Sequence, residues 1–528
     1  MTTRARTTLA LFVFFQAFYA LSSSGNAFRI PDEFELYFQT EHLFDAGDIS
    51  VPQTLEIRQP VVVNGKVVGT QPVFFGKVGQ DGKPYAPYGP FAAVLALPHH
   101  AAGRAIAGML GIPRRPPSEG LAWVMFVAGI TMLTTATAAA LAVAGFYRAV
   151  IALGTPPQAA LWLSLVLGGA TVLWPYGTSF YTEAWQAATM IWAAALLLEA
   201  RTAARPQLNV AMAAILLAVT GLTKVTSLVF APGFVVAALA DTSLPHRRRL
   251  QVAAALAAGI AVATAGHLLW NNHRFGSLFD FGYDWSETIP VMPPQTFLIA
   301  DIPRGLVLLL ATPGKSIFLW APLLVLAGLS IGRTWRLDRG LTIGVATAFA
   351  IGLIFYAAYL FPEGGYAHGP RHLVPIVPLA ALLAAGPAAD RWPRAAWMAC
   401  GGLGFAIALF AVTVSFLEDQ ALRRNAGGQV VAGYYELVDP PPGRANNRYR
   451  LGHIPFVTAI DSPRWWQSPA PGQGPNFFPR YVRQLRRQLP DGGAIPESFT
   501  WWWPAMWLAV MIGAGVTLFR RPPAEKRT

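Results

Sequence analysis

Long apolar stretches alternate with shorter polar connections along most of the 528-residue chain. A helix needs about 20 mainly apolar residues to cross roughly 30 Å of hydrocarbon, and twelve stretches approach that length. This pattern predicts an all-α polytopic membrane protein with about twelve transmembrane helices. The expected spans lie near 7–24, 121–146, 157–176, 180–199, 208–222, 225–241, 250–270, 317–332, 341–361, 372–389, 395–416 and 500–519.

Two segments of the sequence allow more than one count of transmembrane spans. Only Thr223 and Lys224 separate the segments 208–222 and 225–241, so one kinked span and a tight hairpin both fit. The apolar stretch 89–111 could also be counted as a span. The charge distribution favours an interfacial or re-entrant helix there.

Composition supports the membrane class and excludes others. Charged residues make up 13% of the chain and hydrophobic residues 54%, whereas soluble proteins carry about 25% charged residues. These values exclude an ordinary soluble enzyme and a disordered protein. The only cysteine, Cys400, lies in an apolar stretch, so an intrachain disulfide, a zinc–cysteine cluster and a Cys-based redox pair are excluded as well.

Basic residues are distributed as the positive-inside rule requires. If the N-terminus lies inside, the inside segments hold nearly all of the net charge of +13 and the outside segments are close to neutral. We therefore expect an integral protein of a bacterial inner membrane with both termini cytoplasmic, and no nucleic-acid partner. Arg4 and Arg6 before an apolar core, with small residues at 22–27, also fit a cleaved signal peptide. A retained helix instead would anchor the acidic segment that follows.

Three long segments are expected on the outer face, at 25–120, 271–316 and 417–499. Function concentrates on such loops, so the site is expected on this face. The first loop predicts a membrane-surface helix over 29–43 and an Asn-Gly hairpin over 61–68. The third loop is rich in proline, glycine, arginine and aromatic residues and predicts a small irregular segment. The expected units are 1–416, 417–499 and 500–528.

Three carboxylates are candidates for acid–base chemistry. Asp32 and Glu33 follow the first span closely and could supply a general base near the membrane surface. A helix N-terminus that favours acidic residues explains them equally well. Glu183 lies at the outer junction of two spans, where it could orient an acceptor, pair with a basic residue or remain a solvated interfacial carboxylate.

Two cations are candidates for binding an anion. Lys224 lies between apolar segments with no acid nearby in the sequence, so it is a phosphate ligand or a snorkelling side chain. Arg371 lies in a glycine-rich turn, 363–372, which also holds two histidines, and its guanidinium could grip a phosphate bidentately. A plain polar turn is the alternative. Walker-type phosphate loops and zinc-protease motifs are absent.

Several short motifs occur in an order that resembles the GT-C superfamily of membrane glycosyltransferases. The resemblance is strongest to bacterial proteins similar to protein O-mannosyltransferases and aminoarabinose transferases, the glycosyltransferase family 39-like proteins, and covers roughly residues 1–400. No single motif is specific, whereas their order along the topology is. The motifs are Asp32-Glu33, Lys83 to Pro90, Glu183, Gly221 to Lys224, Arg274 to Ser277, and Gly369 to His372, where relatives often have Gly-Pro-Arg-Tyr.

The resemblance implies that a sugar moves from a polyprenyl-phosphate donor to a hydroxyl of an envelope glycan, lipid or protein, with inversion at the anomeric carbon. In that reading Asp32 is the base with Glu33 beside it, and Glu183 orients the acceptor. Tyr85-Ala86-Pro87-Tyr88 departs from the family's double proline. The implied ligands of the substrate or the lipid phosphate are Lys83, Tyr85, Tyr88, Lys224, Arg274, His368 and Arg371.

No cofactor is expected, because the acids form no metal-binding cluster in the sequence, although metal use varies within the superfamily. The competing interpretation is a transporter or flippase for lipid-linked glycans, or a scaffold that has lost catalysis. A transporter predicts charged residues at mid-membrane and related halves. Here the notable acids lie at outer helix ends and no internal repeat is visible.

Overall fold

The structure is a computed structural model of the full chain. It describes residues 3–520 apart from 57, 64–65, 73, 75, 116–118, 283–296, 360–361, 363, 365–366, 386–393 and 415–477. Most of the predicted outer segment 417–499 therefore lies outside the described residues. Its described end consists of α22 (Phe478–Gln488) and a short 3-10 helix, η8 (Gly492–Ala494).

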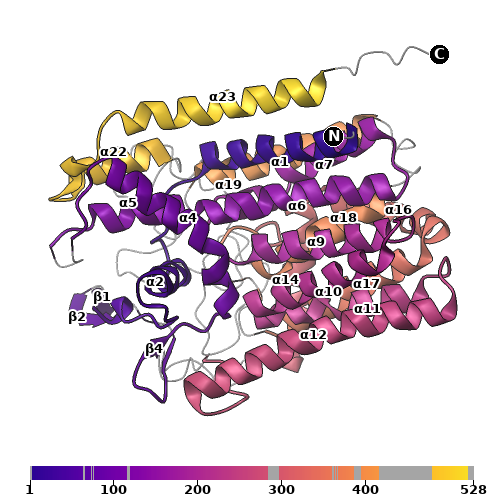
Figure 1. The fold of residues 1–528 in the computed structure, drawn as a ribbon, viewed down its shortest axis with the longest axis horizontal. Coiled ribbons are helices and arrows are strands. Elements are labelled where there is room, and N and C mark those ends of the chain that lie inside the picture. The colour runs from indigo at the N-terminus through magenta and orange to yellow at the C-terminus, as the bar shows by residue number, and fades with distance from the viewer. Residues whose placement is uncertain are drawn as a thin grey trace.

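Most helices run side by side along the long axis of the molecule (Figure 1). α1 (Thr3–Ser22) packs against α6 (Leu133–Ala152) and α23 (Phe499–Phe519), and α6 packs against α9 (Glu183–Glu199). α1 begins and α23 ends at the same end of the bundle. The further helices are α5 (Ala122–Thr131), α7 (Pro157–Gly169), α8 (Leu173–Gly177), α10 (Pro206–Thr223), α11 (Pro232–Ala240), α12 (His246–Phe275), α14 (Ile302–Ala311), α15 (Ile317–Trp320), α16 (Leu323–Leu337), α17 (Arg339–Ala357), α18 (Val377–Ala381) and α19 (Arg394–Thr413).

Seven helical segments among the described residues are long and apolar enough to cross a membrane, which indicates an integral membrane protein. The expected number of twelve is not confirmed. Predicted spans such as 157–176, 317–332 and 372–389 are each divided into shorter helical pieces. The seven are Thr3–Ser22, Ala122–Ala152, Pro206–Thr223, His246–Phe275, Arg339–Ala357, Ala395–Thr413 and Phe499–Phe519.

The doubtful pair 208–222 and 225–241 forms separate elements. α10 ends at Thr223, and Lys224 adopts an extended conformation with φ −155° and ψ 119°. A 3-10 helix, η1 (Val225–Phe230), follows, and α11 starts at Pro232. Proline lacks the N–H that a helix interior needs and is suited to a first turn, so the chain restarts its helix there.

The first long loop contains both elements that the sequence predicts. α2 (Pro31–Ala46) occupies the place of the expected helix and ends at Gly47, whose φ of 68° gives a left-handed cap. β1 (Arg58–Val63) and β2 (Lys66–Pro72) form the antiparallel hairpin, with a bulge between Val61 and Val62. The short helix α3 (Gln53–Glu56) precedes them, and β3 (Lys77–Val78), β4 (Pro84–Tyr85) and α4 (Pro90–Met109) follow.

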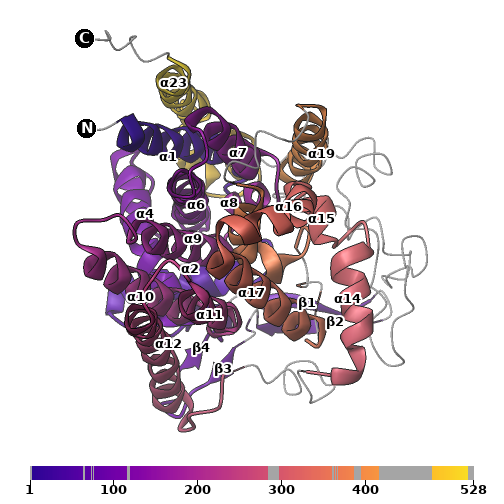
Figure 2. The same ribbon diagram turned by 90° about the vertical axis from the view of Figure 1, so that its right-hand side faces the viewer.

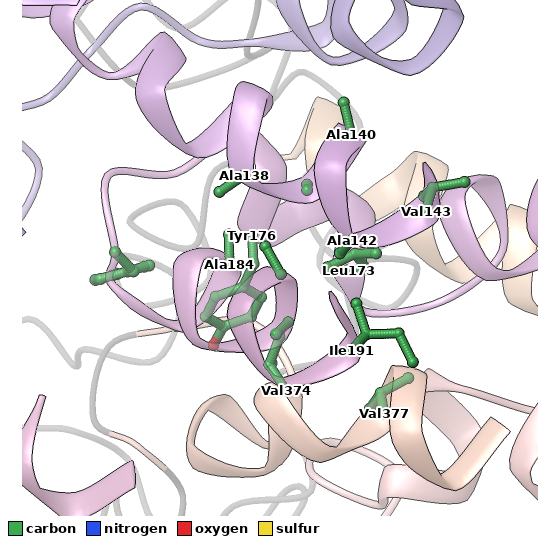
Figure 3. Packing of buried hydrophobic residues seen from close by; sticks show 14 of the residues in the cluster. Ala138, Ala140, Ala142, Val143, Leu173, Tyr176, Ala184, Ile191, Val374 and Val377 are labelled. Atoms are coloured by element: carbon green, nitrogen blue, oxygen red, sulfur yellow. The ribbon is translucent and has the colours of Figure 1, made fainter. Parts of the chain in front are cut away.

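Small side chains let the central helices approach closely. Figure 3 shows Ala138 and Ala142 of α6, Ala184 and Ile191 of α9, and Val377 of α18 in one packed cluster, and all five are buried. Inside a bilayer, helices gain little hydrophobic energy from association, so close van der Waals packing of small residues stabilises them instead. This packing holds the beginning of α9 in a fixed position.

Candidate active site

Helix N-termini position Asp32 and Glu183, two of the three candidate carboxylates. Asp32 lies in the first turn of α2, and Glu183 is the first residue of α9. The unpaired N–H groups and the dipole of a helix N-terminus favour a negative charge there. Both acids therefore occupy places where the backbone stabilises a carboxylate.

The two candidate cations are held by irregular backbone. Arg371 is the first residue of the 3-10 helix η3 (Arg371–Ile376), which follows Gly369 with φ 62°. Gly364 also has a positive φ of 80°, and a Cβ there would lie 2.4 Å from Cβ of Arg371. This glycine therefore leaves room for the arginine side chain. Lys224 is the extended residue between α10 and η1.

These four residues meet in one ion-pair cluster. Arg371 Nη2 donates to Asp32 Oδ1 at 2.9 Å, and Arg371 Nε donates to Glu183 Oε1 at 3.0 Å. Lys224 Nζ donates to the same Glu183 oxygen at 2.8 Å. The two carboxylates and the two cations balance in charge, although the four residues come from four separate segments of the chain.

Burial is uneven across the cluster. The side chains of Glu183, Arg371 and Lys224 are 1%, 6% and 9% exposed, whereas that of Asp32 is 30% exposed. Desolvation makes buried ion pairs costly, so they are weak evidence for a stabilising role and point instead to function. Asp32 is the member that a reactant can reach.

Aromatic side chains complete the surroundings of Asp32 and Arg371. The guanidinium of Arg371 lies 4.1 Å from the ring centroid of Tyr181, and the Tyr88 side chain hydrogen-bonds to Asp32. Burial raises the pKa of Asp32, but the charge and hydrogen bond of Arg371, followed by the Tyr88 hydrogen bond and the charge of Lys224, outweigh burial. The net pKa of Asp32 is therefore below its ordinary value.

Two polar groups next to the cluster are left for a ligand. Oε2 of Glu183 is buried and has no hydrogen-bond partner among the described residues, and neither ring nitrogen of His372 has one. The imidazole of His372 stacks on Tyr356, with ring centroids 4.7 Å apart and planes 8° apart. Unsatisfied buried polar groups are uncommon in native proteins and require an explanation. The sequence motif contains His372, but its side-chain type alone did not single it out.

Glu33 does not join the cluster. Its carboxylate pairs with the guanidinium of Arg29 and accepts the backbone N–H groups of Arg29 at 3.1 Å and Phe180 at 3.2 Å. The side chain is completely buried. With its oxygens engaged in this way, Glu33 ties the start of α2 to the segment before α9 and is poorly placed to accept a proton.

Two other predicted ligands, Lys83 and Tyr85, lie within the first long loop and have partners there. Lys83 is half exposed and pairs with Asp48 at 2.6 Å. Tyr85 donates a hydrogen bond to Asp81 at 2.7 Å. Both residues therefore hold the turn that precedes Tyr88.

Arg274 and His368 also have local partners. Arg274 is buried at the end of α12, where Nη1 donates to the carbonyl of Ala86 at 2.6 Å and Nη2 to Asn271 at 2.9 Å. The His368 ring stacks on Trp320 at 5.9 Å, and its Nε2 lies 3.2 Å from the carbonyl of Val414. Arg274 therefore links α12 to the loop of Tyr88, and these contacts of the His368 ring are with Trp320 and Val414, which do not belong to the cluster.

In the described part of the chain, no three His, Cys, Asp or Glu side chains gather in a way that could hold a metal ion. The four-residue cluster offers two carboxylates, but Arg371 and Lys224 lie against them. No metal ligands can therefore be named at this site.

Comparison with known proteins finds no matching family model and no matching curated protein. Among solved structures, the chain is similar to ArnT from Cupriavidus metallidurans bound to undecaprenyl phosphate, with 14% identity and a TM-score of 0.47 over 97% of this chain and 88% of that one. It is also similar to the Archaeoglobus fulgidus oligosaccharyltransferase tethered with an acceptor peptide, with 13% identity and a TM-score of 0.44 over 94% and 59%. Both are GT-C membrane glycosyltransferases, the superfamily that the sequence motifs resemble. Because these TM-scores are below 0.5, the proposed function rests on the residues of this chain.

Proposed function

We propose that the protein is an inverting glycosyltransferase that moves a sugar from a polyprenyl-phosphate donor to a hydroxyl acceptor on the outer face of the membrane. The observation that carries the proposal is the position of Arg371, which contacts both Asp32 and Glu183, with Lys224 on the second acid. A base and two cations at one site match the two needs of this reaction. Those needs are removal of a hydroxyl proton and stabilisation of a departing phosphate.

The proposed step moves one negative charge across Arg371. The acceptor oxygen attacks the anomeric carbon while Asp32 takes its proton, and the bond from that carbon to the phosphate oxygen breaks. Asp32 loses a negative charge as the polyprenyl phosphate gains one. Arg371 would contact both Asp32 and the leaving phosphate. It can therefore stabilise the negative charge on the phosphate as it develops, without a large movement of its side chain.

Resting contacts keep Asp32 a weak base until a donor arrives. A carboxylate held by Arg371 has a lowered pKa and therefore little affinity for a proton. A phosphate that competes for Arg371 would withdraw this stabilisation and raise the pKa of Asp32. Donor binding would thus prepare the base for proton transfer.

Glu183 is proposed to orient the acceptor. One of its oxygens is held by both Lys224 and Arg371, whereas Oε2 is free of hydrogen-bond partners among the described residues. A buried, fixed acceptor atom can receive the hydrogen of a substrate hydroxyl and hold it in line. The double ion pair makes Glu183 itself a poor proton acceptor.

The remaining predicted ligands are assigned supporting roles. Tyr88 adds a hydrogen bond to Asp32, and Lys83, Tyr85 and Arg274 hold the loop that carries it. Partners expected from this function are the lipid-linked donor, an envelope glycan, lipid or protein as acceptor, and membrane lipids.

Sugar transfer can be tested with purified protein. Wild type, Asp32→Asn and Asp280→Asn proteins would each receive a panel of radiolabelled polyprenyl-phosphate sugars, with cell-envelope extract as acceptor. Asp280→Asn is a matched control because it removes one carboxylate from a partly exposed pair with Lys77, outside the cluster. We expect transfer by wild type and Asp280→Asn, and loss of transfer in Asp32→Asn.

A different pattern would favour the competing interpretation. A transporter or scaffold would bind the lipid-linked sugars but leave every donor intact in all three proteins. That result would contradict the proposed glycosyltransferase function, and Asp32 would then be a structural partner of Arg371.

A further inference from the structure

A cavity lies between α9, α10, α11, α12 and α17, helices that Figure 2 shows side by side. Its lining residues surround about 800 Å³ of space, part of it open to the surroundings. Glu183 begins α9, whereas Arg201 at the cavity follows the end of that helix. At 1.5 Å per residue the two sites are about 25 Å apart. The proposed sugar transfer does not use this cavity.

The body of the cavity is apolar. Leu197 and Leu198 of α9, Val210 of α10, Phe234 of α11 and Val345 of α17 line it. A slot of this kind between helices accommodates a flexible hydrocarbon chain. In a bilayer, however, a chain gains little by leaving lipid for an equally apolar protein surface, so selective binding requires a polar contact as well.

Some of the charged residues at the cavity already have partners of opposite charge. Arg201 pairs with Asp241 and with Asp338. Asp338 also caps α17 by accepting the N–H of Leu341 at 2.9 Å, and Asp241 accepts the N–H and hydroxyl of Ser243. These acids are therefore compensated by cations, by backbone donors and by a helix N-terminus.

Arg248 is the lining residue with an available charge. Its guanidinium donates a long hydrogen bond to Gln251 at 3.5 Å, and no carboxylate in the described ranges lies within ion-pair distance of it. Arg247 and Arg249 flank it and add to the positive potential. Basic pockets between transmembrane helices on the cytoplasmic side are suited to anionic lipid headgroups.

We propose that this cavity binds a membrane phospholipid, with one acyl chain between the helices and its anionic headgroup on Arg248. The apolar wall selects a lipid over a soluble phosphate, and Arg248 selects an anionic headgroup over a zwitterionic one. One interfacial cation changes affinity for an anionic lipid by about fivefold.

Native mass spectrometry of delipidated, full-length protein in detergent provides the test. The probes are phosphatidylglycerol, phosphatidylcholine of the same chains, and soluble glycerol phosphate. We expect one phosphatidylglycerol to bind about fivefold more tightly than phosphatidylcholine, and glycerol phosphate not to bind. Equal binding of the two lipids, or binding of glycerol phosphate alone, would overturn the proposal.

Two pairs of variants locate the site. Leu197→Trp fills the cavity and should remove tight binding, whereas Leu196→Trp changes the neighbouring residue, which does not line the cavity. Arg248→Gln should reduce the preference for phosphatidylglycerol about fivefold, and Arg247→Gln, which removes the same charge outside the lining, should change it much less. Identical binding within both pairs would show that the lipid lies elsewhere.

Discussion

At the scale of single residues, Arg371 determines how the candidate base responds to pH. Burial raises the pKa of Asp32, but the charge and hydrogen bond of Arg371, together with Tyr88 and Lys224, lower it by more. The base form should therefore persist as pH falls, and kcat/KM should decline only below the ordinary range of an aspartate. Arg371→Gln removes the largest of these lowering contributions and therefore raises the pKa of Asp32, so the acid limb of kcat/KM should move to higher pH.

A pH series of initial transfer rates checks this expectation. Lys77→Gln serves as the control, because it removes a cation from the partly exposed pair with Asp280, outside the cluster, and should leave the acid limb in place. An acid limb at the same pH in wild type and Arg371→Gln would mean that Asp32 is not the group that titrates.

His372 is expected to contact substrate, since both its ring nitrogens are buried without partners in the described structure. His372→Phe keeps the stack on Tyr356 and removes both polar atoms. Loss of one hydrogen bond should lower kcat/KM about three- to tenfold, while replacing an unsatisfied polar group should leave the melting temperature unchanged or raised. If transfer rates remain at the wild-type level, His372 has only a packing role.

At the scale of elements, a close helix approach should position Lys224. Gly89 precedes α4, and a Cβ there would lie 2.0 Å from the carbonyl oxygen of Leu222, near the end of α10. Gly89→Ala must displace this turn, so we expect about 1–3 kcal/mol of destabilisation and a reduced transfer rate. Gly108→Ala, within α4, meets open space and should be neutral or slightly stabilising. Thermal unfolding and turnover of both variants check this, and equal behaviour would contradict it.

Elements were predictable where an apolar stretch is uninterrupted. α12 and α23 match the expected 250–270 and 500–519 closely, and the first-loop helix and hairpin are also found. The interruptions within predicted spans were not predictable. The 3-10 helix η1 before Pro232, for example, depends on packing with neighbouring elements. Composition alone does not reveal these breaks.

The candidate site was partly predictable, because charged residues at the ends of apolar stretches are conspicuous in the sequence. Asp32, Glu183, Lys224 and Arg371 stand out as charges at the ends of apolar stretches, and the structure brings them together. The contacts of Glu33 were only partly visible in the sequence, because Arg29 lies four residues before it, whereas Phe180, whose backbone N–H it also accepts, lies far along the chain.

At the scale of the whole molecule, the basic segments and the candidate site lie at opposite ends of the bundle. α9 and α10 connect them, and α1 begins and α23 ends at the end away from α2 (Figure 1). The positive-inside rule therefore predicts that the cluster faces outward and that Arg247 to Arg249 face the cytoplasm.

Cysteine labelling tests this orientation. Cys400 is the only cysteine, so a Cys400→Ser background carries no thiol. In that background, Glu56→Cys near the first-loop hairpin should react with an impermeant maleimide on intact cells. Thr242→Cys, between α11 and α12, should react only after permeabilisation. The reverse labelling would place the cluster in the cytoplasm.

The most direct test of the central claim separates chemistry from binding in Asp32→Asn. Once a donor is identified, its affinity and the single-turnover rate of sugar transfer would be measured for wild type, Asp32→Asn and Asp280→Asn. If Asp32 is the base, Asp32→Asn should lower the rate about 10²–10⁴-fold, with donor affinity within about twofold of wild type. An unchanged rate at saturating donor would contradict the assignment of Asp32 and with it the proposed mechanism.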